Sequence, residues 1–321
     1  MTPQTSPVFW RSTPPAIFPS FLGLFGLGLG WRRAAEIFAV PGWIGEVLLW
    51  GTLAIYLIGA LSYAAKVLAR PCVVAQDMGS VPGRAGVGAI SIGLLLMAVM
   101  LQPVSTGAAL VLLAMGLIGH AVLAVMAIRI ILALPPEQRH VMPSWHLAFV
   151  AFIVGPISAV PLGLTNLSYA ILWLTVGLSM LIYMTSVRHI RATPPPLRPL
   201  MAIHLAPFSL FSTVATALGH PRLAVVFALL ASLILIALVV NRKWLTQGGF
   251  TPLWSAFTFP LAAYAIALLN LNGQSAVMAV MATIGFGVLL LASVLIPVIV
   301  IRVLRLWASG KLAVATKAAV A

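Results

Sequence analysis

The feature that most constrains this chain is a succession of apolar runs, each about twenty residues long or longer, that carry almost no charge. Only 7% of its 321 residues are charged, and 62% are hydrophobic. Soluble domains carry about 25% charged residues, so this composition cannot cover a water-exposed surface. The chain is therefore predicted to be an all-α integral membrane protein.

The apolar runs lie between Pro-rich, Gly-rich or polar breaks and predict ten membrane-spanning helices. They cover residues 15–32, 43–66, 85–102, 107–133, 143–163, 167–187, 200–218, 222–241, 251–270 and 274–304. Residues 1–14 are then a cytoplasmic leader, expected to be disordered or to lie along the surface. Residues 15–307 form the transmembrane domain, and residues 308–321 form a cytoplasmic tail. The last span holds Pro297 and is expected to kink there or to extend beyond the bilayer.

The basic residues predict the orientation, because short cytoplasmic loops collect Lys and Arg. With the amino terminus inside, only Arg32, Arg33 and Arg222 of the 18 Lys and Arg residues fall at the outer ends of the spans. Both termini are thus predicted to lie in the cytoplasm, and the protein in the inner (plasma) membrane. The formal net charge of +14 follows chiefly from this topology, and its placement does not predict nucleic-acid binding.

Composition also argues against several kinds of chemistry. The single cysteine, Cys72, excludes disulfide frameworks and thiolate clusters. The four acidic residues are scattered singly, at Glu36, Glu46, Asp77 and Glu137. The only acid with a histidine in the same segment is Glu137, three residues before His140. We therefore expect no metal site, no cofactor and no enzymatic activity.

Odd-numbered and even-numbered spans differ in character. The odd spans contain Pro or Gly with Ser and Thr nearby, and the even spans are plainer. The predicted kinks in the odd spans are Pro19, Pro156, Pro207 and Pro260. A broken helix is tolerated in a membrane where its freed carbonyls meet protein or water. This pattern predicts five inner helices around a path and five outer helices facing lipid; the alternative is that Pro and Gly are simply common in membrane helices.

Three short segments carry a resemblance to a known family. They are Pro143-Ser144-Trp145, Leu205-Ala206-Pro207 and the run WSAFTFP from Trp254 to Pro260, each at the matching ordinal helix. On these segments the chain resembles the tellurite-resistance/dicarboxylate transporter family, which includes the slow anion channels of plant guard cells.

The resemblance implies helical hairpins in a pseudo-five-fold arrangement, with odd helices lining a central pore and a homotrimer in which each subunit has its own pore. It implies passage of small inorganic anions or dicarboxylates, gated by an aromatic residue of span nine. That residue is Phe259, or Phe257 if the register slips by two. The alternative activity is a proton-coupled carrier or exporter of four-carbon dicarboxylates, sulfite or tellurite. On pattern alone, Phe259 could instead be an ordinary core aromatic.

A few other residues are candidates for specific roles. His146 and His204 open spans five and seven near the predicted cytoplasmic mouth, where they could form a pH-sensing vestibule or simply bond backbone carbonyls. Gly26 and Gly30 have the spacing that lets membrane helices approach closely. Glu46 is expected to stabilise the amino terminus of span two.

Overall fold

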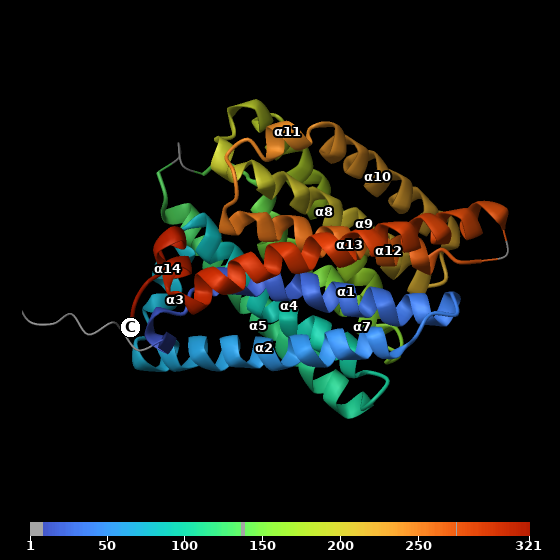
Figure 1. Ribbon diagram of the computed structural model, residues 1–321, viewed down its shortest axis with the longest axis horizontal. Coiled ribbons are helices and arrows are strands. Elements are labelled where there is room, and N and C mark those ends of the chain that lie inside the picture. Colours follow the sequence, from blue (N-terminus) through green and yellow to red (C-terminus); the bar gives the residue numbers. More distant parts are fainter. Residues whose placement is uncertain (1–8, 136–138, 274) are drawn as a thin grey trace, which may run out of the picture.

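The computed structural model of the chain describes residues 9–135, 139–273 and 275–321, and within them it contains helices and connections but no strand. The long helices are α1 (Phe18–Ile37), α2 (Trp43–Ala69), α4 (Val81–Leu101), α5 (Thr106–Ala133), α8 (Thr165–Val187), α10 (Pro221–Val240) and α13 (Ala276–Ala308). Shorter α-helices are α3 (Val73–Met78), α6 (His146–Phe149), α7 (Gly155–Ala159), α9 (Leu205–Ala217), α11 (Arg242–Leu245), α12 (Thr258–Asn270) and α14 (Lys311–Thr316). Helices α1, α2 and α13 run side by side along the longest axis (Figure 1). The predicted all-α class is confirmed.

Several α-helices begin directly after a 3-10 helix. These 3-10 helices are η2 (Pro15–Ile17) before α1, η5 (Ala151–Val154) before α7, η7 (Pro195–His204) before α9 and η8 (Pro252–Phe257) before α12. The prolines predicted as kinks are the second or third residues of the α-helices that follow, namely Pro19, Pro156, Pro207 and Pro260. The first four N–H groups of an α-helix have no partner within it, so proline removes no hydrogen bond there. These prolines therefore mark changes from 3-10 to α geometry, not kinks inside continuous helices.

Burial divides the apolar segments into two classes. Within one apolar 18-residue stretch of each segment, the share of buried residues is 72% in α4, 89% in Pro195–Ala217 and 67% in Pro252–Asn270. In the corresponding stretches it is only 28% in α2, 22% in α5, 28% in α8, 22% in α10 and 33% in α13. The buried segments correspond to odd-numbered predicted spans and the exposed ones to even-numbered spans, so the sequence pattern distinguished buried from exposed segments among these eight.

Within the described residues, eight helices are long and apolar enough to cross a membrane. The two other predicted spans fall outside this group. One is α1, whose four glycines and two arginines lower its mean hydropathy. The other is residues 143–159, which are divided into η4 (Pro143–Trp145), α6, η5 and α7 instead of one continuous helix. The number ten and the five-fold arrangement thus stay predictions.

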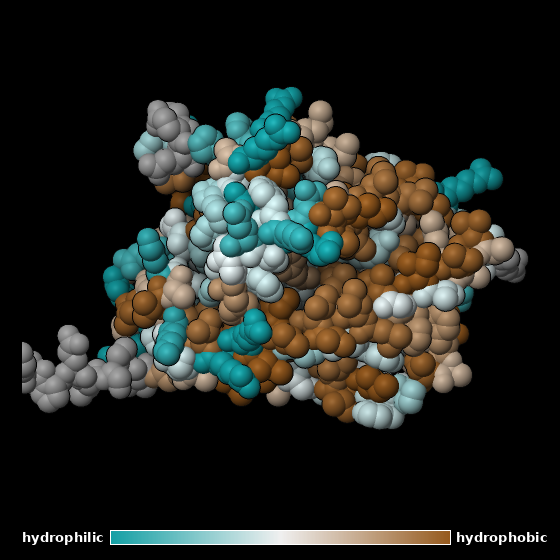
Figure 2. All heavy atoms as spheres, turned by 45° about the horizontal axis from the view of Figure 1, so that its top comes forward, coloured by the Kyte–Doolittle hydropathy of each residue, from teal (hydrophilic) through white to brown (hydrophobic). Residues whose placement is uncertain are grey.

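The exposed faces of the outer helices are apolar. Large exposed side chains on them include Leu61, Leu68, Ile118, Leu233 and Val294. Figure 2 shows hydrophobic residues over the middle of one face, with most hydrophilic residues in the half that holds α14 in Figure 1. An apolar belt with a polar end is what a bilayer requires of a multi-pass membrane protein.

Two helix ends differ from their predicted positions. Helix α1 continues to Ile37, so Arg32 and Arg33 belong to the helix itself. Helix α13 has 33 residues and runs through Pro297 without interruption. At about 1.5 Å per residue it is roughly 50 Å long, which exceeds a hydrocarbon core of about 30 Å. Of the two outcomes expected for this span, the continuous helix corresponds to extension beyond the bilayer.

The two described ends of the chain meet at one end of the molecule. The backbone N–H of Ala321 donates to the carbonyl oxygen of Arg11 at 3.1 Å, and the ring of Phe9 lies 5.1 Å from that of Trp307. Thr13 is fully buried. Residues 9–14 are therefore ordered: none of Phe9–Ser12 is buried, which agrees with the expected leader along the surface, whereas Thr13 and Pro14 are buried, so that expectation is wrong for these two. Residues 1–8 lie outside the described part. Termini at one end agree with an even number of crossings.

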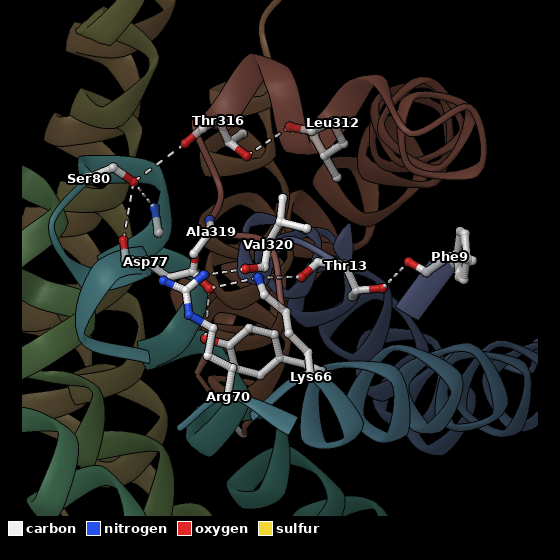
Figure 3. Close-up of polar contacts among 12 residues, drawn as sticks. Phe9, Thr13, Lys66, Arg70, Asp77, Ser80, Leu312, Thr316, Ala319 and Val320 are labelled. Atoms are coloured by element: carbon white, nitrogen blue, oxygen red, sulfur yellow. Dashed lines mark hydrogen bonds and ion pairs between the residues drawn. The ribbon is translucent and has the colours of Figure 1, made fainter. Parts of the chain in front are cut away.

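A buried ion pair holds these ends together (Figure 3). Lys66 Nζ lies 3.0 Å from Asp77 Oδ2, and both side chains are 0% exposed. Lys66 Nζ also donates to the carbonyl oxygen of Thr13 at 3.1 Å. Asp77 accepts from the Tyr63 hydroxyl at 3.1 Å and from the Ala319 N–H at 2.7 Å. We call these five residues the terminal cluster. It joins the leader, α2, α3 and the tail, which are distant in sequence.

Candidate functional site

A cavity of about 60 Å³, called here the central cavity, lies among the buried segments. Its lining comes from η2, α1, α4, residues 143–154, η7, α9, η8 and α12, and none of it from the exposed helices. Among the described residues that line it, His146 and Ser255 are the only polar side chains, and no Lys, Arg, Asp or Glu is present. The segments predicted to be inner helices thus enclose an apolar cavity.

The first turns of three α-helices reach this cavity. The cavity is lined by Pro19 of α1, by Pro207 of α9, and by Phe259 and Pro260 of α12. The first N–H group of each of these helices bonds back to the preceding 3-10 helix, from Phe18 to Pro15, from Leu205 to Ala202 and from Thr258 to Ser255. The helix starts at the cavity are therefore continuous with the 3-10 segments before them, and the cavity they border is apolar.

A second cavity, of about 200 Å³, is lined by polar as well as apolar residues. We call it the Arg32 cavity. Its polar lining consists of Arg32, Arg33, Glu36, Gln102, Thr213 and Asn270. Arg32 is held by an ion pair with Glu46, from Nε to Oε1 at 2.8 Å, and donates to the carbonyl oxygen of Met100 at 2.9 Å. Glu46 is thus chiefly the partner of Arg32, an ion pair that the sequence did not predict.

Phe259 and Leu210 are the two residues that line both cavities. Their side chains are 8% and 6% exposed, so both are closely surrounded by protein. A Cβ atom added to Gly26 of α1 would lie 3.4 Å from Cδ2 of Phe259 and 2.9 Å from the Cβ of Ala262. The absence of a side chain at Gly26 therefore gives the Phe259 ring its place between the cavities, as the predicted close approach requires.

Phe257, the second choice for the gate, has different surroundings. It lines neither of these cavities and lies in a groove with residues of α10, α11 and α13. Its ring is 5.8 Å from that of Trp254, with an interplanar angle of 86°. Of the two phenylalanines in the WSAFTFP run, the geometry favours Phe259 as the residue that separates the cavities.

The two predicted vestibule histidines lie in direct contact. His146 Nε2 is 3.0 Å from His204 Nδ1, and His204 Nε2 is 3.1 Å from Ser186 Oγ. The imidazoles are 3% and 4% exposed. His146 lines the central cavity. The contact is between side chains, so the alternative of interfacial histidines that bond backbone carbonyls does not describe this pair.

The other acid and histidine candidates do not gather here. Glu137 lies outside the described residues, so its proximity to His140 is not described. His140 lies beside His189, with ring centroids 5.7 Å apart. His120 of α5 bonds Ser91 Oγ through Nδ1 at 2.7 Å and packs on Phe152. Across the described residues, no group of three His, Cys, Asp or Glu side chains could hold a metal ion.

Comparison with known proteins identifies the family. The sequence model of the voltage-dependent anion channel family matches residues 12–302. No curated protein sequence matches the chain. The matched region includes the residues that line both cavities, and it agrees with the resemblance to anion channels and transporters seen in the WSAFTFP run. Because the match extends over most of its length, this chain belongs to the voltage-dependent anion channel family.

Proposed function

We propose that this protein passes small inorganic anions or dicarboxylates across the membrane along a path through the central cavity and the Arg32 cavity. The observation that carries the proposal is that Phe259 and Leu210 stand between two cavities lined by buried segments. Among the described residues that line the central cavity there is no carboxylate to repel an anion. In the other cavity, Arg32 and Arg33 offer guanidinium N–H donors, although each is paired with a carboxylate, Glu46 and Glu36 respectively. Weak stabilisation suits conduction, because an ion must also leave.

Phe259 is the proposed gate of this path. Its ring occupies the junction of the cavities, and an aromatic ring there blocks an ion both sterically and by excluding water. Pro260 lies next to it in the first turn of α12, where the backbone changes from 3-10 to α geometry. Rotation of the ring away from Leu210 would join the two cavities.

The test is Phe259→Ala in proteoliposomes, with chloride flux as the measurement. We expect flux to rise about tenfold or more, equivalent to lowering the barrier by about 1.4 kcal/mol. Phe257→Ala is the matched control, since it removes the same ring from the same segment outside both cavities. Equal chloride flux in wild type and Phe259→Ala would remove Phe259 from the gate.

We further propose ten membrane crossings with pseudo-five-fold hairpins, and a homotrimer with one path per subunit. Helix α1 and residues 143–159 supply the two crossings beyond the eight continuous apolar helices. Both line the central cavity, as the other inner segments do. Native mass spectrometry of the detergent-solubilised protein measures the assembly, and a monomer or dimer mass would exclude the trimer.

The proposed orientation in the plasma membrane places both termini in the cytoplasm. Cys72 is the single cysteine of the sequence, and it is exposed between α2 and α3. A membrane-impermeant maleimide should label it only after the cells are permeabilised. The control replaces Cys72 with Ser and His220 with Cys, which moves the thiol to the opposite predicted side. Labelling of Cys72 in intact cells would reverse the orientation.

A second candidate function is a proton-coupled carrier or exporter of four-carbon dicarboxylates, sulfite or tellurite. The buried His146–His204 contact at the central cavity favours it, since histidine binds a proton near neutral pH. Current that reverses at the anion equilibrium potential, whatever the pH gradient, would support the channel. A reversal potential that shifts with the pH gradient would support the carrier.

A further inference from the structure

The protons of the two histidines can be assigned from the hydrogen bond that the neighbouring Ser186 makes to the backbone. Ser186 Oγ donates to the carbonyl oxygen of Ile182 at 2.6 Å, so it accepts from His204 Nε2–H. A neutral His204 then has a bare Nδ1, which accepts from His146 Nε2–H. The chain of bonds from Ser186 through His204 thus assigns the proton of neutral His146 to Nε2.

This assignment leaves His146 Nδ1 as a free proton acceptor. Within the described residues, Nδ1 is buried without a hydrogen-bond partner. The imidazole is 3% exposed and lines the central cavity. A buried polar atom without a partner is rare in folded proteins and requires an explanation. Here the free atom belongs to His146, which is the only titratable side chain among the described residues that line the central cavity of the proposed anion path.

On the described elements that contact the pair, no residue carries a carboxylate. His204 also lines a third cavity, of about 400 Å³, with Tyr183, Arg191 and Asn241. The ring of Tyr183 lies 4.9 Å from that of His204. The other titratable or charged residues on elements in contact with the pair are Arg84, His120, Arg129, Tyr169, Arg198, Arg222, Arg242, Lys243 and Tyr264. None of these elements carries Asp or Glu, so no anionic side chain on them offsets a proton on His146.

A proton on His146 Nδ1 therefore needs an anion from outside the protein. A lone positive charge in an apolar cavity is costly, and so is a lone anion. When both are present, the two opposite charges lie close together and offset one another. Because binding free energies are reciprocal, an anion that favours the proton is itself favoured by the proton to the same extent.

We infer that His146 binds one proton at Nδ1 together with an anion in the central cavity, so that anion passage is coupled to protonation. The inference rests on the proposed anion path and adds the residue at which the proton binds. The reaction forms one N–H bond and breaks none within the pair, since His146 Nε2 keeps its proton and its bond to His204. His204 and Ser186 are positioning residues, because they hold His146 in the tautomer that leaves Nδ1 free.

The experiment measures chloride flux into proteoliposomes between about pH 5 and pH 8, the range in which histidine ordinarily titrates. For wild type we expect flux to rise as pH falls, approaching about tenfold per pH unit in the alkaline part of the range, as binding of one proton requires. His146→Gln keeps a polar side chain of similar size but cannot titrate, so its flux should not depend on pH. His204→Gln should keep a pH dependence with a shifted midpoint.

The matched control is His220→Gln. His220 is exposed, and its Nε2 lies 2.6 Å from the Tyr169 hydroxyl, away from the central cavity. It should reproduce the wild-type profile. A wild-type pH profile in an active His146→Gln protein would overturn the inference. Absence of chloride flux from wild type at every pH would instead contradict the proposed function.

A binding measurement keeps the inference testable if His146→Gln fails to fold. Calorimetric titration of the wild-type protein with chloride, in two buffers of different ionisation enthalpy, reports the protons taken up per anion bound. We expect a value approaching one proton per anion at the alkaline end of the range. Chloride binding with no proton uptake at any pH would overturn the inference.

Discussion

The terminal cluster and the central cavity are two buried regions that differ in their charged side chains: the first contains an ion pair, and the second is lined almost entirely by apolar residues. In the terminal cluster, Lys66 and Asp77 are both fully buried, and each has further partners from the backbone or from Tyr63. The described residues that line the central cavity include no Lys, Arg, Asp or Glu. A buried charge is tolerated when its partners are fixed in place. Where an ion has to move, fixed partners would hold it, whereas a lining with a single titratable residue, His146, offers weaker and reversible stabilisation.

Removing one partner of the buried ion pair in the terminal cluster should have the largest effect on the stability of the protein. Asp77→Ala leaves Lys66 buried without its counter-ion, which costs about 3–5 kcal/mol. We expect the leader and tail to detach and the protein to unfold at a much lower temperature in detergent, as thermal unfolding would show. Glu36→Ala is the matched control, because Glu36 is 56% exposed in its pair with Arg33 and should cost less than about 1 kcal/mol.

The double variant Lys66→Met/Asp77→Leu tests the reason for that effect. Replacing both charges with apolar side chains leaves no unpaired ion, so it should be less destabilising than Asp77→Ala alone. If the double variant were the less stable of the two, an uncompensated charge would not be the cause.

Introducing a negative charge into the central cavity should strongly reduce the passage of anions through it. In Leu210→Asp the carboxylate lies between the two cavities and repels an anion by about 2–4 kcal/mol over roughly 4–8 Å at an effective dielectric constant of about 20. Chloride flux should fall about a hundredfold at neutral pH relative to Leu210→Asn, which has nearly the same shape. The difference should shrink in acid, where the carboxylate is protonated. Equal fluxes at neutral pH would place the path elsewhere.

A side chain at Gly26, in the space that the Phe259 ring now uses, should change stability and chloride flux less than the substitutions above. The added methyl group of Gly26→Ala would lie 2.9 Å from Ala262 Cβ, so α1 and α12 must move apart or the ring must turn. We expect destabilisation of about 1–3 kcal/mol together with altered chloride flux. Gly119→Ala on α5, where a Cβ meets no atom within 4 Å, should leave both unchanged or raise stability by about 1 kcal/mol. Equal behaviour of the two variants would show that Gly26 does not support the ring.

The smallest effect is expected at the partly exposed ion pair of the Arg32 cavity. The side chains of Arg32 and Glu46 are 19% and 42% exposed, so Glu46→Gln should cost only about 0.2–1 kcal/mol. Thermal unfolding would measure this cost, with Asp77→Ala as the reference. A loss as large as that of Asp77→Ala would mean that exposure does not distinguish the two ion pairs.

Much of the inner architecture could be predicted from the sequence. Pro and Gly in alternate apolar runs indicated which segments are buried, and the WSAFTFP run indicated Phe259. The position of Leu210 between the cavities could not be predicted, because nothing in the sequence distinguishes it from the other apolar residues of its span. Lys66 and Asp77 are two of the few charged residues and lie eleven positions apart, but their spacing did not reveal burial. Their partners Thr13 and Ala319 come from the two ends of the chain, which only the folded structure brings together.

The sequence by itself determined the membrane class, the approximate position of the apolar segments and the division between plain and interrupted helices. These properties depend on local composition and periodicity, which a bilayer converts directly into burial. The tertiary structure alone decided that His146 meets His204, that Phe259 rather than Phe257 separates the cavities, and that the chain ends close over a buried ion pair. Those outcomes depend on which helix faces meet. The two histidines are 58 positions apart in the sequence, so only the packing of their helices brings them into contact.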